Sequence, residues 1–195
     1  MKRMKKYFLI FALMLMAMGL SFTVVSCSSD DNEDFVQEAA TTEEVKTFFE
    51  KDCNIITENL VGGFFTAEDY MGVVNGDGVI PPSLVKILAI HSQEELESVY
   101  KGALKLPQID FNQHVLLVGL TYNASGQESL GKVRLLHGQG DSYELQVIMY
   151  WNTNTNYGYF QLFSPVLFWR LYPKFPTNHM NVVRRVEEVW SDYQE

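Results

Sequence analysis

The fold of this chain is decided by the stretch His114-Val115-Leu116-Leu117-Val118-Gly119-Leu120-Thr121-Tyr122. Side chains of an extended strand point alternately to two faces, so Val115 and Leu117 share one face while Leu116 and Val118 share the other. Both faces are therefore apolar. A strand with two apolar faces is usually buried on both sides, and the stretch predicts the central strand of a sheet.

The residues ahead of this strand predict a strand, a short helix and a crossover. Leu84 to Ile90 is an apolar run rich in β-forming residues. Ser92 and Glu95 have the spacing of a capping box, in which the two side chains satisfy free N–H groups at the start of a helix. This spacing predicts a short helix from Ser92 to about Lys101. Residues 106–111 then cross over to the central strand.

Three further strands are expected after the central strand. Gly131 to His137 and Tyr143 to Trp151 both alternate apolar and polar residues, and the glycine-containing loop 138–141 between them predicts a hairpin. Residues 157–172 are rich in aromatic rings, and we expect part strand and part helix there. Met180 to Val189 fits either a helix or a strand. We favour the strand, because it would close the sheet.

A first helix is predicted from about Thr41 to Leu60, ahead of the terminator Gly62-Gly63. Thr41 and Glu44 have capping-box spacing. Apolar residues recur at intervals of three and four and share one face: Val45, Phe49, Cys53, Ile56 and Leu60. The order of elements predicts an α+β fold. Its N-terminal helix and short second helix would pack on a mainly antiparallel sheet, either twisted or curled into a half-open barrel.

The first 26 residues have the layout of a secretory signal. Bases at positions 2, 3, 5 and 6 precede the almost wholly apolar residues 7–22. About 20 apolar residues can also span a bilayer, so an uncleaved helical anchor is the alternative. The stretch Val24-Val25-Ser26-Cys27 resembles the bacterial lipobox. This resemblance implies that Cys27 is diacylated and becomes the mature N-terminus, and two or three acyl chains anchor stably.

The stretch Ser28 to Asp34 carries four acidic groups and no basic one, which predicts a solvated, extended chain. It resembles the acidic export signal of surface lipoproteins of the Bacteroidetes, which implies an outer-membrane protein that faces the cell exterior. A plain flexible tether is compatible with the same residues. The expected organisation is a lipoprotein signal peptide at 1–26, an acidic flexible tether at 27–40 and a single α+β domain at 41–195.

The charge balance and the cysteine count exclude several classes of site. Residues 1–26 hold four of the 15 lysines and arginines and none of the 24 acids, so the remaining chain has a formal charge of −13. An acidic surface opposes binding to nucleic acid, which depends on neutralising phosphates, and opposes electrostatic attachment to anionic lipid. With Cys27 taken by lipid, Cys53 is the only thiol, which excludes an intrachain disulfide and a multi-cysteine zinc site. Cys53 itself is expected to be a small buried hydrophobic residue.

The sequence contains no familiar catalytic or metal-binding motif. The histidines fall at the ends of predicted elements, and none has metal-ligand spacing: His91, His114, His137 and His179. There is no Gly-x-Ser-x-Gly elbow, phosphate-binding glycine loop or dinucleotide fingerprint. Asp110 is expected to cap the turn before the central strand. We therefore assign no catalytic residue, no metal ligand and no cofactor from the sequence.

Three segments together resemble a known group of domains. They are Ser92-Gln93-Glu94-Glu95-Leu96, Leu106-Pro107-Gln108-Ile109-Asp110-Phe111 and Leu116-Leu117-Val118-Gly119. They are similar to small extracellular lipoprotein domains of the Bacteroidetes and, more distantly, to the C-terminal domain of PrcB-like protease-complex subunits. The resemblance covers about residues 84–190, carries no catalytic residue and implies a role beside a secreted protease. Where the PrcB-like group has a Gly-Gly-Tyr turn, this chain has Asn123-Ala124-Ser125-Gly126-Gln127.

One stretch, residues 150–159, predicts recognition of a ligand. It interleaves aromatic rings with amide and hydroxyl side chains. Flat rings can stack on sugar or peptide, and the polar groups can supply hydrogen bonds. Trp151, Tyr157 and Tyr159 are the candidate ligand-binding residues. The alternative is a hairpin whose aromatic rings face the core, and the alternation of its strand turns Trp151 inward.

Three functions remain open from the sequence. The preferred one is a lipid-anchored envelope lipoprotein, not an enzyme, whose domain binds a protein or glycan partner. The second is an accessory subunit or modulator of a secreted protease. The third is a carboxylate-dependent hydrolase, which needs two acids at a set separation. In a chain with 24 acids some pair always exists, so this pattern carries no signal.

Overall fold

The computed structural model describes residues 34–53, 56, 60–66, 69, 85–123, 128–153 and 164–189. Its strands form two main sheets and one short hairpin. The first main sheet, here called the inner sheet, has the antiparallel order β4 (Lys86–Ile90), β5 (His114–Asn123), β8 (Ser164–Pro173). The stretch that opens the sequence analysis is β5, so its prediction as a central strand is confirmed.

The second main sheet, here called the outer sheet, has four strands. Their order is β1 (Asp34–Val36), β6 (Glu128–His137), β7 (Tyr143–Asn152) and β9 (Met180–Val189). β6 and β7 form the predicted hairpin, in which Gly140 takes a φ of +67°, a left-handed value that favours glycine. The strand favoured for Met180 to Val189 is confirmed as β9. It runs parallel to β7, whereas the other strand pairs are antiparallel.

An extra residue in β6 sets which of its side chains face the core. The pairing of β6 with β7 slips between Leu130 and Lys132, so Gly131 forms a β-bulge. The ring of Tyr150 packs on Gly131, where an added Cβ would lie 2.7 Å from the ring. Beyond the bulge Val133 is buried and Lys132 is exposed, as the alternation predicts.

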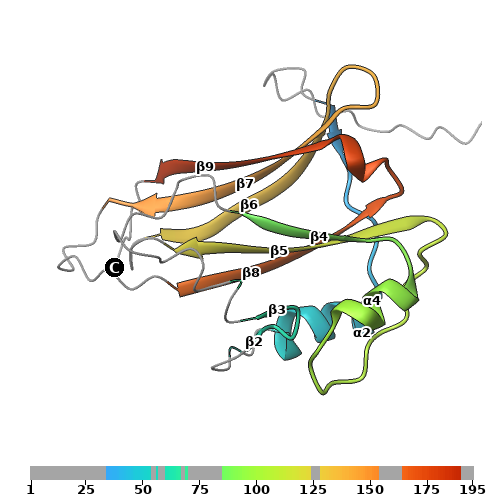
Figure 1. Cartoon of the computed structure of the whole chain (residues 1–195). Coiled ribbons are helices and arrows are strands. Elements are labelled where there is room, and N and C mark those ends of the chain that lie inside the picture. The colour runs from blue at the N-terminus through green and yellow to red at the C-terminus, as the bar shows by residue number, and fades with distance from the viewer. Residues whose placement is uncertain are drawn as a thin grey trace, which may run out of the picture. The chain divides into compact units, whose positions relative to one another are not determined.

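Figure 1 shows the outer sheet on one side of the inner sheet and the helices α2 and α4 on the other. An apolar core lies on each of these two faces of the inner sheet. In the core between the sheets, Val115 and Leu117 of β5 pack with residues of β6 and β7 such as Leu135. On the opposite face of β5, Leu116 and Val118 belong to the core that contains the helices. All five of these side chains are fully buried. The described fold is therefore a sheet-dominated α+β sandwich with helices against one sheet.

The two sheets remain open, so the half-open barrel considered from the sequence is wrong. β4 and β8 end the inner sheet, and β1 and β9 end the outer sheet. No pairing between the described strands joins one sheet to the other. The physical reason lies in the connection after β5: the chain leaves the inner sheet there and continues as β6 of the outer sheet, rather than as a hydrogen-bonded neighbour of β5.

The first helix is shorter than the sequence predicts. α2 (Glu43–Thr47) continues into one π-helical segment, η1 (Phe48–Asp52), and a turn follows at Cys53. The N-cap is Thr42 rather than Thr41, because the hydroxyl of Thr42 accepts a hydrogen bond from the N–H of Val45 at 3.3 Å. α2 and η1 still bury one face, since Val45 and Phe49 lie in the core.

Leu60, predicted as the last residue of this helix, lies in a small hairpin instead. β2 (Leu60–Val61) pairs with β3 (Phe65–Thr66), and Ile56 bridges to Val61. Gly62 and Gly63 have φ values of +59° and +74°, so they make the turn of this hairpin and do not end a helix. The left-handed pair of glycines explains the difference, because it turns the chain back on itself and lets Leu60 and Val61 pair as a strand with Phe65 and Thr66.

The second helix is confirmed as α4 (Gln93–Val99). The hydroxyl of Ser92 accepts a hydrogen bond from the N–H of Glu95 at 3.0 Å, and the Glu95 carboxylate accepts one from the N–H of His91 at 2.7 Å. A 3-10 turn, η2 (Thr177–His179), leads into β9. The ring Nε2 of His91 lies 2.9 Å from the Thr177 hydroxyl, so this contact joins the start of α4 to the start of β9.

The predicted tether is too long at its C-terminal end. Asp34 to Val36 pair with β6, and the N–H of Ala39 donates to the carbonyl of Leu171 at 2.8 Å. Residues 34–39, which the sequence assigns to the tether, accordingly belong to the folded part of the described chain. The predicted signal peptide and Cys27 lie outside the described residues. Among the helices that are described, none is long and apolar enough to cross a membrane.

Candidate binding groove

A groove opens where β1 leaves the outer sheet. After Val36 the chain crosses to the inner sheet, where Ala39 forms its hydrogen bond with β8. The groove has a volume of about 420 Å³ and is lined from β1, the crossing chain, β6 and β8. Its lining residues are Phe35, Val36, Gln37, Glu38, Val133, Arg134 and Tyr172. A second cavity, beside Cys53, has only about 170 Å³ and is lined by apolar residues and that cysteine.

The floor of the groove is apolar and buried. Val133 and Tyr172 both belong to the core between the sheets. The hydroxyl of Tyr172 is buried without a hydrogen-bond partner in the described structure. Burial raises the pKa of this hydroxyl, and the charge of Glu38 raises it further, while Arg170 and the backbone of Leu135 act in the opposite direction. Tyr172 is therefore neutral at physiological pH.

One rim of the groove carries an aromatic ring and a fixed guanidinium group. Phe35 is 40% exposed, and the guanidinium carbon of Arg134 lies 4.9 Å from the centre of its ring, a favourable cation–π distance. The Nε of Arg134 donates to the amide oxygen of Gln146 at 2.9 Å, and the Gln146 amide donates to Glu144 at 2.8 Å. Arg185 reaches the same Glu144 oxygen at 3.4 Å. This ladder across three strands holds Arg134 in place at the groove.

The other rim carries an ion pair. The Nε of Arg170 lies 2.9 Å from a carboxylate oxygen of Glu38, whose side chain is 53% exposed. Exposed pairs of this kind contribute little to stability, so the effect of the pair is mainly local. Of the two residues, Glu38 lines the groove, and Arg170 neutralises its charge there. Among the described residues, Arg134 has no acidic partner of its own, and it is the cation that the groove offers to a ligand.

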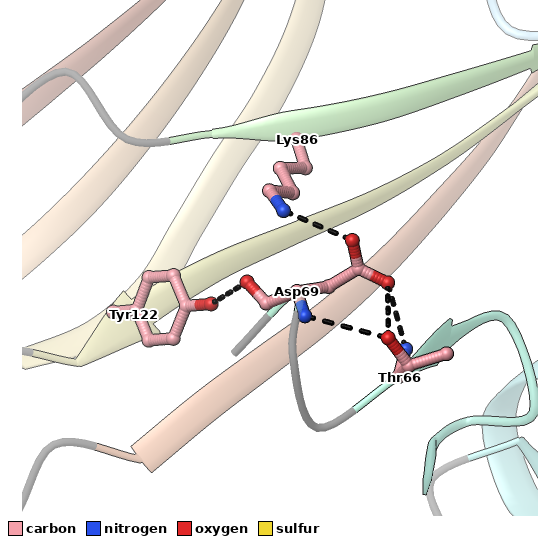
Figure 2. Close-up of polar contacts among 4 residues, drawn as sticks. All are labelled: Thr66, Asp69, Lys86 and Tyr122. Carbon is pink, nitrogen blue, oxygen red and sulfur yellow. Dashed lines mark hydrogen bonds and ion pairs between the residues drawn. The ribbon is translucent and has the colours of Figure 1, made fainter. Parts of the chain in front are cut away.

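A second polar cluster centres on Asp69 (Figure 2). One carboxylate oxygen accepts hydrogen bonds from the N–H and the hydroxyl of Thr66 at 2.8 and 2.9 Å, and the other lies 2.9 Å from the Lys86 ammonium. The Thr66 N–H does most to lower the pKa of Asp69, and Lys86 adds to it, against partial burial. The Tyr122 hydroxyl donates to the Asp69 carbonyl at 3.1 Å. An ionised, fully engaged carboxylate is suited to hold this segment on the inner sheet rather than to transfer protons.

A third cluster is a buried ion pair between the sheets. The guanidinium of Arg184 on β9 lies 2.7 Å from the Glu128 carboxylate on β6. The same nitrogen donates to the carbonyl of Tyr122 on β5 at 3.1 Å. The two side chains are only 7% and 5% exposed, so each charge depends on the other for compensation. The cluster joins the outer sheet to the inner sheet.

Of the residues that the sequence singles out for binding, the structure describes only Trp151, which does not line the groove. Trp151 lies near the end of β7, half-buried and paired with Glu128 on β6. By the alternation of β7 it lies on the face of Leu145 and Val147, but it is not one of the residues that pack in the core between the sheets, so its inward direction stays a prediction. Tyr157 and Tyr159 lie outside the described residues.

The residues predicted to be structural have structural surroundings. Cys53 is 1% exposed and lies in the core that contains the helices, here called the helix-side core. The Asp110 carboxylate accepts a hydrogen bond from the N–H of Asn112 at 3.1 Å, which caps the turn as predicted. Ring nitrogens of His114 and His137 lie 3.0 and 2.8 Å from backbone carbonyls. Within the described ranges, no three potential metal ligands come together.

Comparison of the chain with family models, with curated proteins and with solved structures gives no match. The groove is therefore interpreted from its own residues. Sequence reasoning missed it because its walls come from three separate segments, around Phe35, Arg134 and Tyr172. Only the pairing of β1 with β6 and the crossing to β8 bring these segments together. No local pattern in the chain signals such a pairing.

Proposed function

We propose that this protein is a lipid-anchored lipoprotein of the outer membrane, facing the cell exterior, whose sandwich binds a ligand in the groove beside β1. The groove is the observation that carries the binding role. Its volume of about 420 Å³ falls in the range of ligand sites, about 300–1,000 Å³. It combines an apolar floor with an aromatic ring and fixed charges at the rims, as ligand sites usually do. The proposed role is binding rather than catalysis.

The proposed location at the outer membrane rests on Cys27 and the acidic residues that follow it. The lipobox-like stretch would place acyl chains on Cys27, and only residues 28–33 separate this cysteine from β1. A chain of that length reaches at most about 25 Å when fully extended. Phe35, on the rim of the groove, would therefore be held close to the membrane. This arrangement suits a ligand that is met at the cell surface.

A variant that fills the groove tests the binding role. Gln37 is an exposed residue that lines the groove, and Gln139 is an exposed residue of the β6–β7 turn. The full-length protein in detergent would be screened against glycan and peptide arrays, together with Gln37→Trp and the matched control Gln139→Trp. We expect a ligand whose binding falls at least tenfold in Gln37→Trp and is unchanged in Gln139→Trp. Ligands that bind all three proteins equally would place recognition elsewhere.

A further inference from the structure

The groove borders an edge of β6 that no strand of the described structure covers, here called the uncovered edge. β6 pairs with β7 from Glu128 to His137, apart from the bulge, but it pairs with β1 only from Leu135 to His137. On the β1 side, no described strand covers residues 129–134. Backbone N–H and carbonyl groups at the edge of a sheet form a template for pairing with another chain. The crossing chain at Gln37 and Glu38 has moved away from this edge, and the groove fills the space between them.

The pleat of β6 predicts the side chains that an added strand would carry. Neighbouring strands place paired residues on the same face of the sheet. A residue paired with Val133 would point into the groove, toward the apolar Val36 and the ring of Tyr172. Residues paired with Lys132 and Arg134 would point to the outer face, where both of these side chains are cationic. An added strand would therefore alternate between an apolar residue and a residue that complements positive charge.

The charges around this edge specify the sign of the partner. Lys132 is exposed, and Arg134 is held by Gln146 rather than by an acid. Of the acids nearby, Glu144 is engaged by Gln146 and Arg185, and Glu38 by Arg170. The edge thus presents two cations in a chain whose charge after the predicted signal peptide is −13. Screening at physiological salt acts over about 8 Å, so the local cations dominate the attraction of a short ligand.

We propose that the uncovered edge of β6 binds an extended peptide segment of a partner protein by strand addition, and that this segment alternates apolar and acidic residues. The inference rests on the proposed function and names the ligand class of the same groove. Main-chain hydrogen bonds supply affinity in this mode of recognition, and the alternate side chains supply specificity. The partner's apolar side chains enter the groove, while its carboxylates face Lys132 and Arg134.

Designed peptides separate the backbone contribution from the charge contribution. The probe is a fluorescent ten-residue peptide of alternating Asp and Val, and the protein is the full-length chain in detergent micelles. The first control replaces each Asp by Lys, and the second keeps the sequence but methylates the backbone nitrogens. Fluorescence anisotropy should show binding of the Asp–Val peptide. We expect at least tenfold weaker binding of the Lys–Val peptide and of the methylated peptide.

Two matched charge reversals locate the site on the protein. Lys132 and Lys105 are both exposed lysines, but Lys105 lies in the loop after α4. Lys132→Glu should weaken binding of the Asp–Val peptide at least tenfold and strengthen binding of the Lys–Val peptide. Lys105→Glu should change the affinity for neither peptide. The two variants have the same net charge, so a difference between them reports position.

Several outcomes would overturn the inference. Equal binding of the methylated and unmethylated peptides would exclude strand addition. Equal binding of the Lys–Val and Asp–Val peptides would exclude the proposed preference for acidic residues. A dimer of the full-length chain that Lys132→Glu dissociates would assign the edge to a second copy instead. If no peptide binds but a glycan binds in a manner sensitive to Gln37→Trp, the inference fails while the proposed function stands.

Discussion

Tyr172 is one of the described residues with a buried polar side-chain atom that has no hydrogen-bond partner. Removing the hydroxyl in Tyr172→Phe takes away a group that lost its water on folding and gained only a weak contact with the backbone of Leu135. We expect the free energy of unfolding to stay the same or to rise by about 1 kcal/mol. The matched control is Tyr122→Phe, where a buried hydroxyl donates to the Asp69 carbonyl at 3.1 Å. That variant should lose about 1 kcal/mol, and urea denaturation at neutral pH measures both.

Tyr172→Phe should also differ from the wild type in how its free energy of unfolding changes at alkaline pH. An unfolded tyrosine ionises near its ordinary pKa of 10.0, whereas the raised pKa of Tyr172 keeps its proton in the folded state to higher pH. Above pH 10.0 the folded state therefore binds more protons than the unfolded state, so stability falls as pH rises. The free energy of unfolding of Tyr172→Phe should not show this part of the decrease. An equal alkaline loss in wild type and variant, from denaturation on either side of pH 10.0, would contradict the assignment.

At the scale of elements, the Arg184–Glu128 pair ties β9 and β6 to the carbonyl of Tyr122 on β5. Arg184→Met would leave a buried carboxylate without its counter-charge, so we expect a loss of about 3–5 kcal/mol in the free energy of unfolding. The neighbouring Arg185→Met is the control. Arg185 is half-exposed and its contact with Glu144 is 3.4 Å long, so its removal should cost at most about 1 kcal/mol.

A double variant tests whether the loss comes from the unpaired charge. Arg184→Met combined with Glu128→Gln removes both charges, so it should be less destabilised than the sum of the two single variants. Chemical denaturation of the four proteins gives the coupling energy directly. Additive losses would mean that the two side chains act separately, and would contradict the role of the pair in joining the sheets.

Elements were predictable from the sequence where the deciding interactions are local. The serine cap of α4 and the phase of β5 depend on residues a few positions apart, and both are confirmed. The end of the first helix was missed because Gly62-Gly63 signals a turn without saying whether it closes a helix or a hairpin. The direction of β9 was beyond reach, since its parallel partner β7 is set by the path of the intervening chain.

At the scale of the whole molecule, the division of strands between two sheets is the feature that the sequence could not supply. β5 and β6 are consecutive in the chain, yet they belong to different sheets, and β9 pairs with β7 rather than with β8. These pairings decide where β1 lies and hence where the groove opens. The candidate site was therefore unpredictable for the same reason as the topology: both depend on contacts between distant segments, whereas helix caps and strand phases do not.

The two cysteines of the chain provide an internal comparison for the proposed anchor. Cys27 follows the lipobox-like residues, whereas Cys53 is buried in the helix-side core at 1% exposure. In bacteria fed radioactive palmitate, Cys27→Ala should lose all label, because no acyl acceptor remains next to the signal peptide. It should also keep its leader and migrate as a longer chain. Cys53→Ala should keep full labelling, even if the lost side chain lowers stability by about 1–3 kcal/mol. Label that persists on Cys27→Ala would show that the lipid is not attached to Cys27. The short distance that we infer between the membrane and the groove would then no longer follow.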